Sequence, residues 1–195
     1  MRYQLPLACF AVFFMQNAAN GLSPQDVKKE EKAAAFTLAD VKYFHRFTKD
    51  EMHEFTPAGQ KDLKHWTDMV TINYYRKAKD AEAIATAANA TLGTYKAAQG
   101  LVIRTDSVPR TKDKPAEHLM VVAFLRPKFV EVAFARFRMH GGIGTSVVYS
   151  HRIYGKEAEN KKKIGVWIKK NGPMTETNLM KWKMPKGDIT GTTSS

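Results

Sequence analysis

The sequence contains almost no cysteine: Cys9 is the single one among 195 residues. A disulfide joins two cysteines, so none can form within this chain. The rest of the composition supplies another source of stability, because 44% of the residues are hydrophobic and 11% are aromatic. The sequence therefore predicts a domain that is stabilised by a hydrophobic core without cross-links.

Long hydrophobic runs are missing as well. The most apolar stretch near the N-terminus covers residues 5–15, well short of the roughly 20 residues that a transmembrane helix needs. Arg2 precedes this stretch and small residues follow it, which is typical of a cleavable signal peptide. We expect cleavage near Gly21 to remove residues 1–21 and to leave a periplasmic or extracellular chain without a transmembrane span. The alternative is an N-terminal helix buried in the domain, which the charged residues after Leu22 disfavour.

Acidic residues are in the minority, with 19 Asp and Glu against 31 Lys and Arg, and the net charge is +12. Such a charge favours anionic partners, and export makes nucleic acid the least suitable of them. The partner that we expect is an unknown protein or an anionic polymer. Many of the basic residues lie near the C-terminus, where they form either an anion-binding surface or the solvated face of a helix: Lys161, Lys162, Lys163, Lys169 and Lys170.

The chain shows no internal repeat, and its composition changes at two places. Residues 22–35 are charged and rich in alanine without an apolar stripe, so they predict a linker or a frayed helix. Residues 36–182 carry the periodic apolar patterns of one folded domain. Residues 183–195 are small and polar, and we expect them to be a disordered tail.

Hairpin patterns dominate the domain. In the most distinct one, residues 129–138 and 145–154 flank a glycine-rich turn at 140–144. Consecutive hairpins pair their strands antiparallel, so the sequence predicts an α+β fold, a mostly antiparallel sheet flanked by helices. The other predicted strands cover residues 41–47, 51–55, 69–75, 101–105 and 118–125.

Helical patterns occur in three places. Asp80 is a suitable N-cap and Gly100 a suitable C-cap for a long helix between them. A short helix is predicted at residues 60–66. The closing helix has an inward stripe that includes Trp167, and residues 171–173, Asn-Gly-Pro, are expected to end it. A shorter helix should follow and carry Leu179 and Trp182.

The strand at 145–154 holds the main candidates for a ligand site. Ser150 and His151 are adjacent, yet neighbouring strand residues point to opposite faces, so they cannot act together as nucleophile and base. The sequence also lacks the Gly-x-Ser-x-Gly pattern of a nucleophile elbow. Ser150, Arg152 and Tyr154 share one face of this strand and Tyr149, His151 and Ile153 the other. One face is polar enough to line a groove, that of Ser150, Arg152 and Tyr154, and the alternative is a face that solvent or a helix covers. The candidate ligand-binding residues are Tyr149, His151, Arg152 and Tyr154.

His45 and His53 are weak candidates for a metal site. They would face each other across a hairpin that turns at Lys49, but Glu54 points to the other side and no third ligand is evident. The glycines at 141–144 are followed by a strand, whereas a phosphate-binding loop is followed by a helix. We therefore expect neither a metal nor a cofactor.

The element order resembles that of the Mog1/PsbP-like α/β/α sandwich over residues 36–182. The matching features are an early hairpin, a strand leading into the helix at residues 80–99, an antiparallel meander, and a closing helix with Trp167. The resemblance implies a non-enzymatic accessory or binding role and transfers no functional residue.

These observations predict an exported, non-catalytic binding or accessory protein whose ligand is unknown. One alternative is an exported hydrolase of unfamiliar type, in which His151, Arg152 and Tyr154 would be the residues to replace first. Another is a basic protein whose C-terminal lysines bind an anionic envelope polymer.

Overall fold

The computed structural model describes residues 34–112 and 114–185, and these belong to one compact unit. The predicted signal peptide, Cys9, residues 22–33 of the predicted linker and residues 186–195 of the predicted tail lie outside the described residues. Met184, which the prediction placed in the tail, is described and is buried.

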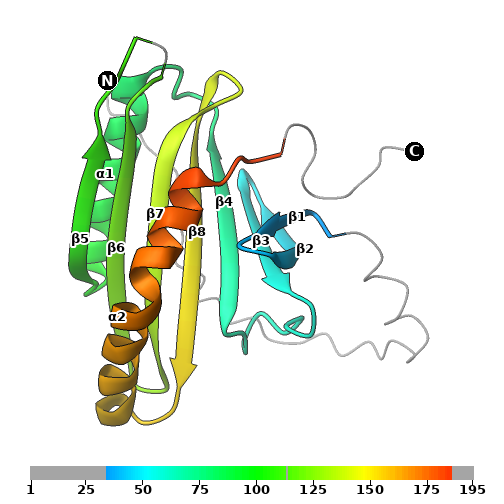
Figure 1. Ribbon diagram of the computed structural model, residues 1–195, viewed down its shortest axis with the longest axis vertical. Coiled ribbons are helices and arrows are strands. Elements are labelled where there is room, and N and C mark those ends of the chain that lie inside the picture. The colour runs from blue at the N-terminus through cyan, green and yellow to red at the C-terminus, as the bar shows by residue number, and fades with distance from the viewer. Residues whose placement is uncertain (1–33, 113, 186–195) are drawn as a thin grey trace. The chain divides into compact units, whose positions relative to one another are not determined.

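The centre of the fold is an eight-stranded sheet in the order β1-β2-β3-β4-β8-β7-β6-β5 (Figure 1). Every neighbouring pair of strands is antiparallel. The predicted α+β class with an antiparallel sheet is therefore confirmed. The strands are β1 (Phe36–Leu38), β2 (Val41–Lys49), β3 (Met52–Pro57), β4 (Asp68–Tyr75), β5 (Leu101–Val108), β6 (Glu117–Arg126), β7 (Phe129–His140) and β8 (Ile143–Tyr154).

The hairpin of β7 and β8 forms as predicted. Its turn contains Gly141 and Gly142 at φ angles of +58° and +80°, a left-handed conformation that glycine adopts without strain. The short strand β1 was not predicted, because three residues are too few to show an alternating pattern.

The helix α1 (Ala81–Ala97) begins as predicted, with the Asp80 carboxylate accepting a hydrogen bond from the Ala83 N–H at 2.8 Å. Its end differs from the prediction, since Gln99 holds the left-handed position with φ +59° and Gly100 follows it. Glycine is required at position 100 for packing, because a Cβ there would lie 2.7 Å from the Phe124 ring.

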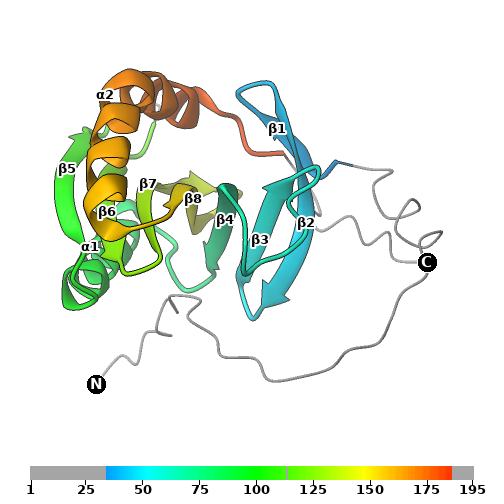
Figure 2. The ribbon, with the colours of Figure 1, turned by 90° about the horizontal axis from the view of Figure 1, so that it is seen from below.

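The helix α2 (Glu157–Lys181) runs through Pro173, so the predicted end at residues 171–173 is wrong. Figure 2 shows that α2 changes direction along its length, as expected for a helix with an internal proline. The helix continues because Leu179 in its last turns is buried on the sheet, with 1% of its surface exposed. Trp182 is the residue that ends the helix.

The helix predicted at residues 60–66 is also wrong, and this segment is an irregular loop. The Gln60 side-chain carbonyl accepts hydrogen bonds from the backbone N–H groups of Thr67 and Asp68, at 2.7 and 2.9 Å. These bonds give the backbone N–H groups at the end of the loop their partners without helical hydrogen bonds. Trp66 is buried nevertheless.

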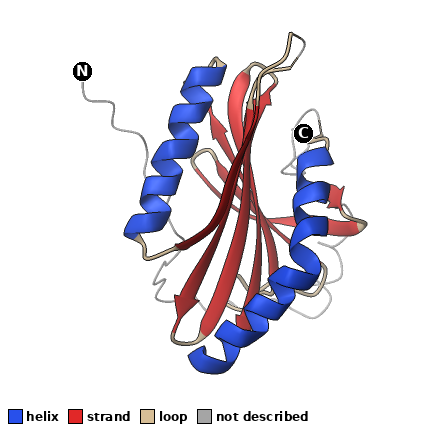
Figure 3. Cartoon of the chain, turned by 60° about the vertical axis from the view of Figure 1, so that its left-hand side comes forward, coloured by secondary structure: helices blue, strands red, loops and turns tan. Residues whose placement is uncertain are grey.

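The two helices cover opposite faces of the sheet (Figure 3). On the face covered by α1, here the α1 face, Tyr95 packs against Phe124. On the other, the α2 face, Trp167 packs against Phe134. No helix in the described ranges is long and apolar enough to cross a membrane.

Candidate functional site

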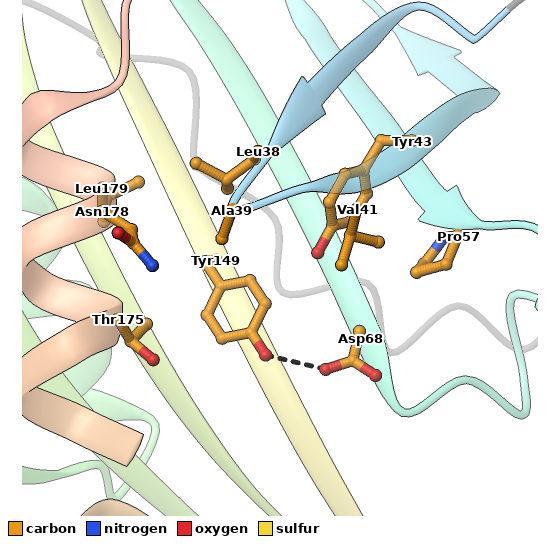
Figure 4. A pocket seen from close by; sticks show the side chains of 10 residues that line it. All are labelled: Leu38, Ala39, Val41, Tyr43, Pro57, Asp68, Tyr149, Thr175, Asn178 and Leu179. Atoms are coloured by element: carbon orange, nitrogen blue, oxygen red, sulfur yellow. Dashed lines mark hydrogen bonds between the residues drawn. The ribbon is translucent and has the colours of Figure 1, made fainter.

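A cavity of about 200 Å³ lies on the α2 face, between the C-terminal half of α2 and the turn that joins β1 to β2 (Figure 4). Most of its wall is apolar. Its lining residues are Leu38, Ala39, Val41, Tyr43, Pro57, Asp68, Tyr149, Thr175, Asn178 and Leu179.

The β1–β2 turn forms one wall of the cavity. Ala39 and Asp40 in this turn have φ angles of +49° and +62°, which are uncommon for residues with a side chain. The turn is held toward α2 because the Trp182 indole N–H donates to the Thr37 carbonyl at 2.8 Å. The Phe36 ring also packs against Trp182, with ring centroids 5.0 Å apart. These contacts fix the wall to the end of the helix.

Asp68 is the charged residue among those that line the cavity, and hydrogen bonds occupy both of its oxygens. Oδ1 accepts from the Tyr149 hydroxyl at 2.7 Å and is 3.0 Å from His151 Nδ1. Oδ2 accepts from the Thr67 hydroxyl at 2.8 Å. Burial raises the pKa of Asp68, but hydrogen bonds from His151, Tyr149 and Thr67 outweigh it and lower the pKa to about 2. Asp68 is therefore ionised at neutral pH, with its acceptor capacity largely used inside the protein.

His151 is held beside this carboxylate by ring stacking. Its imidazole lies parallel to the Trp167 indole, with ring centroids 4.2 Å apart and an angle of 10° between the planes. Because the Asp68 carboxylate can only accept, Nδ1–H is the donor of this hydrogen bond, and Nε2 is the nitrogen left for other partners. The side chain is 15% exposed.

Three neutral polar groups face the cavity without a side-chain hydrogen bond to any described residue: the Tyr43 hydroxyl, the Thr175 hydroxyl and the Asn178 amide. Burial, together with the charge of Asp68, raises the pKa of Tyr43 well above its usual value. The Tyr43 hydroxyl therefore stays protonated and can both donate and accept a hydrogen bond.

The structure separates the four candidate ligand residues of β8 onto two faces. Tyr149 and His151 lie on the α2 face, at and beside the cavity. Arg152 lies on the α1 face, where its guanidinium is 3.9 Å from the centroid of the Trp66 ring and donates to Glu131 at 2.8 Å.

Tyr154 is also on the α1 face and holds the loop before β4. Its hydroxyl accepts from the Trp66 backbone N–H at 3.1 Å and donates to the Trp66 carbonyl at 3.0 Å. Arg152 and Tyr154 therefore share a structural cluster with the loop and are not brought together with His151. This arrangement does not assemble the residue set of the hydrolase alternative.

Three residues of this region were missed by the sequence reasoning. Asp68 stands just before an apolar strand, but its pairing with His151 joins residues that are 83 positions apart. The roles of Tyr43 and Trp167 likewise depend on contacts between distant elements. The one available signal was the acidic residue at the start of the strand.

The histidines of the β2–β3 hairpin lie on one face but not directly opposite each other. The hairpin turns at Asp50 and Glu51 rather than at Lys49, so His53 pairs with Thr48. The Thr48 hydroxyl lies between the rings, 2.8 Å from His45 Nε2 and 3.0 Å from His53 Nδ1. Within residues 34–112 and 114–185, no group of three or more His, Cys, Asp or Glu side chains could hold a metal ion.

The five candidate anion-binding lysines are all exposed on α2. One of them, Lys163, forms an ion pair with Glu159 at 3.4 Å, and both side chains are more than half exposed. An exposed pair of this kind contributes little to stability.

No family model and no curated protein matches the sequence. Several solved structures resemble the fold loosely, among them a yeast and a human protein. The Ran-binding protein Mog1p of Saccharomyces cerevisiae superposes with a TM-score of 0.40 and 10% identity over 63% of this chain and 73% of Mog1p. Human STARD10 superposes with a TM-score of 0.31 and 10% identity over 86% of this chain and 82% of STARD10. The predicted loose resemblance to the Mog1 class is confirmed, and it concerns the fold alone.

Proposed function

We propose that this chain is an exported, non-catalytic binding protein whose cavity on the α2 face takes a small neutral molecule. The ligand would have an apolar body and a hydroxyl, carbonyl or amide group. The proposal rests on a contrast between the polar groups of the cavity. Both oxygens of the Asp68 carboxylate already accept hydrogen bonds within the protein. The side-chain polar groups of Tyr43, Thr175 and Asn178 are neutral and have unused hydrogen-bonding capacity.

The charge of the ligand follows from Asp68. A cationic ligand would have to displace Tyr149 or His151 from the carboxylate, and each displacement would leave a polar group without its partner. An anionic ligand would be repelled by the same carboxylate, since its depressed pKa keeps it ionised. A neutral ligand avoids both costs.

The size of the ligand follows from the cavity. Pockets for drug-sized molecules measure about 300 to 1,000 Å³, and this cavity, at about 200 Å³, is smaller. It suits a molecule of on the order of ten non-hydrogen atoms. Leu38, Val41 and Leu179 provide the apolar contacts for its body.

The local chemistry favours binding over catalysis. Within the described ranges, the only side-chain hydrogen bond of His151 is to Asp68, and no serine, threonine or cysteine is bonded to its imidazole. Nucleophilic catalysis needs such a residue within reach of the base.

A series of three probes with one apolar body tests the charge requirement: cyclohexanol, cyclohexylammonium and cyclohexanecarboxylate. We expect cyclohexanol to bind most tightly of the three by ligand-observed NMR. Tighter binding of either charged probe would contradict the neutral ligand.

A matched pair of variants on α2 tests the place of binding. Thr175→Val removes a hydroxyl at the cavity, and Thr177→Val removes an exposed hydroxyl of the same helix that bonds to the Pro173 carbonyl. We expect Thr175→Val to weaken cyclohexanol binding about threefold to tenfold, the value of one neutral hydrogen bond. Thr177→Val should leave binding unchanged, and equal effects of the two variants would place the site elsewhere.

Export has its own test. The apolar stretch at residues 5–15 and the small residues after it support a signal peptide. We expect the intact mass of the protein recovered from its own cells to match a chain that starts at Leu22. An unprocessed mass would refute export through a cleaved signal peptide and would leave the ligand proposal unaffected.

The lysines of α2 support a second candidate function, binding of an anionic polymer, because all five are exposed along one helix. Such binding should weaken steeply with added salt. Replacing Lys161, Lys162, Lys163, Lys169 and Lys170 with glutamine should abolish retention on an acidic polysaccharide. Retention that survives these substitutions would contradict this function.

A further inference from the structure

Strand β5 forms one end of the sheet, and its outer edge pairs with no other strand among the described residues (Figure 1). Its inner edge is paired with β6 along most of its length. The backbone N–H and C=O groups along the outer edge are therefore available for another strand.

The side chains of β5 are unusually exposed for a strand of this sheet. Leu101, Ile103 and Val108 have 60%, 44% and 50% of their surface exposed. Exposed apolar side chains next to an unpaired edge are typical of a surface that accepts another strand.

Two opposite charges lie on one side of this edge. Arg104 Nη2 is 2.8 Å from Asp106 Oδ2, and Arg104 Nη1 is 3.1 Å from Glu176 of α2, so these charges lie on the α2 face. Thr105 stands between them and faces the opposite side, as the alternation of a strand requires. Arg104 and Asp106 are about half exposed.

We propose that a second copy of this chain pairs with β5 in an antiparallel register centred on Thr105. A two-fold axis normal to the sheet at this residue places Arg104 opposite the partner's Asp106. The same axis places Asp106 opposite the partner's Arg104. Each guanidinium then has a carboxylate beside it on its own strand and another directly across the interface.

In this register Val108 lies opposite the partner's Val102, and Ile103 lies opposite the partner's Ser107. Leu101 falls beyond the paired residues. The bulge between Val102 and Arg104 limits regular pairing to the centre of the strand. A contact of this length is small, and we expect a dissociation constant of about micromolar or weaker.

The charge pattern gives a sharp test, because either single reversal places two like charges directly opposite each other across the axis. Sedimentation velocity of the full chain should show a concentration-dependent dimer. Arg104→Asp and Asp106→Arg should each weaken this dimer roughly tenfold or more. An equimolar mixture of the two variants should dimerise again, because each strand then meets its opposite charge across the axis.

The double variant Arg104→Asp/Asp106→Arg should also restore the dimer in a single chain. The matched control is Arg76→Asp, which reverses an exposed arginine paired with Glu51 at 2.6 Å on the other half of the sheet. This control should leave the dimer unchanged, and circular dichroism should show that each variant is folded.

Three results would overturn the proposal: a monomer at the highest soluble concentration, a dimer that survives both single reversals, or a mixture that stays monomeric. If the protein is a monomer, the charges of β5 instead prevent its outer edge from pairing with another strand. Hydrogen exchange provides a measurement without substitutions, since amide exchange in β5 should slow as the protein concentration rises. Exchange that is independent of concentration would count equally against the dimer.

Discussion

The two faces of β8 carry similar polar residues and use them differently. On the α1 face, Arg152 lies between the rings of Trp66 and Phe129, and its guanidinium is paired with Glu131. On the α2 face, Tyr149 and His151 bond to Asp68 at the edge of a cavity. The sequence indicates the face of Ser150, Arg152 and Tyr154 as the one polar enough to line a groove, whereas the cavity lies on the opposite face, that of Tyr149.

The difference between the faces is the hydrogen-bonding capacity that remains. The groups of the α1 face are directed at one another and at the loop before β4, so they stabilise the protein. The cavity on the α2 face keeps the Tyr43 hydroxyl, the Thr175 hydroxyl and the Asn178 amide without partners among the described residues. Polar groups with unused hydrogen-bonding capacity beside an apolar cavity indicate a ligand site better than the presence of polar residues on a strand face does.

The largest expected effect is on the α1 face. Arg152→Ala should lower the free energy of unfolding by about 3 kcal/mol, because it leaves the Glu131 carboxylate unpaired with only 13% of its side chain exposed. Urea denaturation measures this loss. Binding of cyclohexanol to the folded variant should be unchanged, since Arg152 lies across the sheet from the cavity.

The double variant Arg152→Ala/Glu131→Ala controls for the unpaired charge. It should be less destabilised than the sum of the two single changes, because neither charge is left alone. A loss of cyclohexanol affinity in folded Arg152→Ala would contradict the separation of the two faces.

The second effect is on the α2 face and depends on pH. Asp68→Asn should lower the free energy of unfolding by about 2 kcal/mol at neutral pH, since the pKa of Asp68 falls from 3.8 to about 2 in the folded protein. A lowered pKa gives stability that is present above the ordinary value and is lost as the pH falls from about 4 through about 2. Urea denaturation of both proteins across this range should therefore show their difference shrinking. A difference that is constant with pH would mean that the charge of Asp68 does not cause it.

The parts of the fold that were predicted correctly depend on local signals. Gly141 and Gly142 mark the β7–β8 turn because that turn needs positive φ angles. Asp80 marks the start of α1 because its carboxylate accepts a hydrogen bond from the backbone N–H three residues later. The predicted end of α2 is wrong because a tertiary contact competes with the local signal. Pro173 normally ends a helix, but burial of Leu179 on the sheet continues α2 beyond it.

The candidate site was less predictable than the fold. Alternation along β8 separates Tyr149 and His151 from Arg152 and Tyr154, and this much follows from the sequence. Which face lies beside a cavity depends on the pairing of β4 with β8, where Asp68 meets His151. That register joins segments far apart in the chain, and no local pattern specifies it.

The smallest effects come from a pair of tyrosines that differ in their partners. Tyr154→Phe should lower the free energy of unfolding by about 1 kcal/mol, because the Trp66 backbone loses the hydroxyl that it bonds on the α1 face. Tyr43→Phe should change stability by less than about 0.5 kcal/mol, since its hydroxyl has no partner among the described residues.

The same pair should show the opposite order in ligand binding. Tyr43→Phe should weaken cyclohexanol binding about threefold to tenfold, because the ligand loses a donor and acceptor at the cavity. Tyr154→Phe should leave the affinity unchanged. Urea denaturation and ligand-observed NMR on the two variants measure both quantities. If Tyr43→Phe proved the more destabilising change and had no effect on binding, the Tyr43 hydroxyl would be structural and the cavity would lose one of the three groups that mark it as a ligand site.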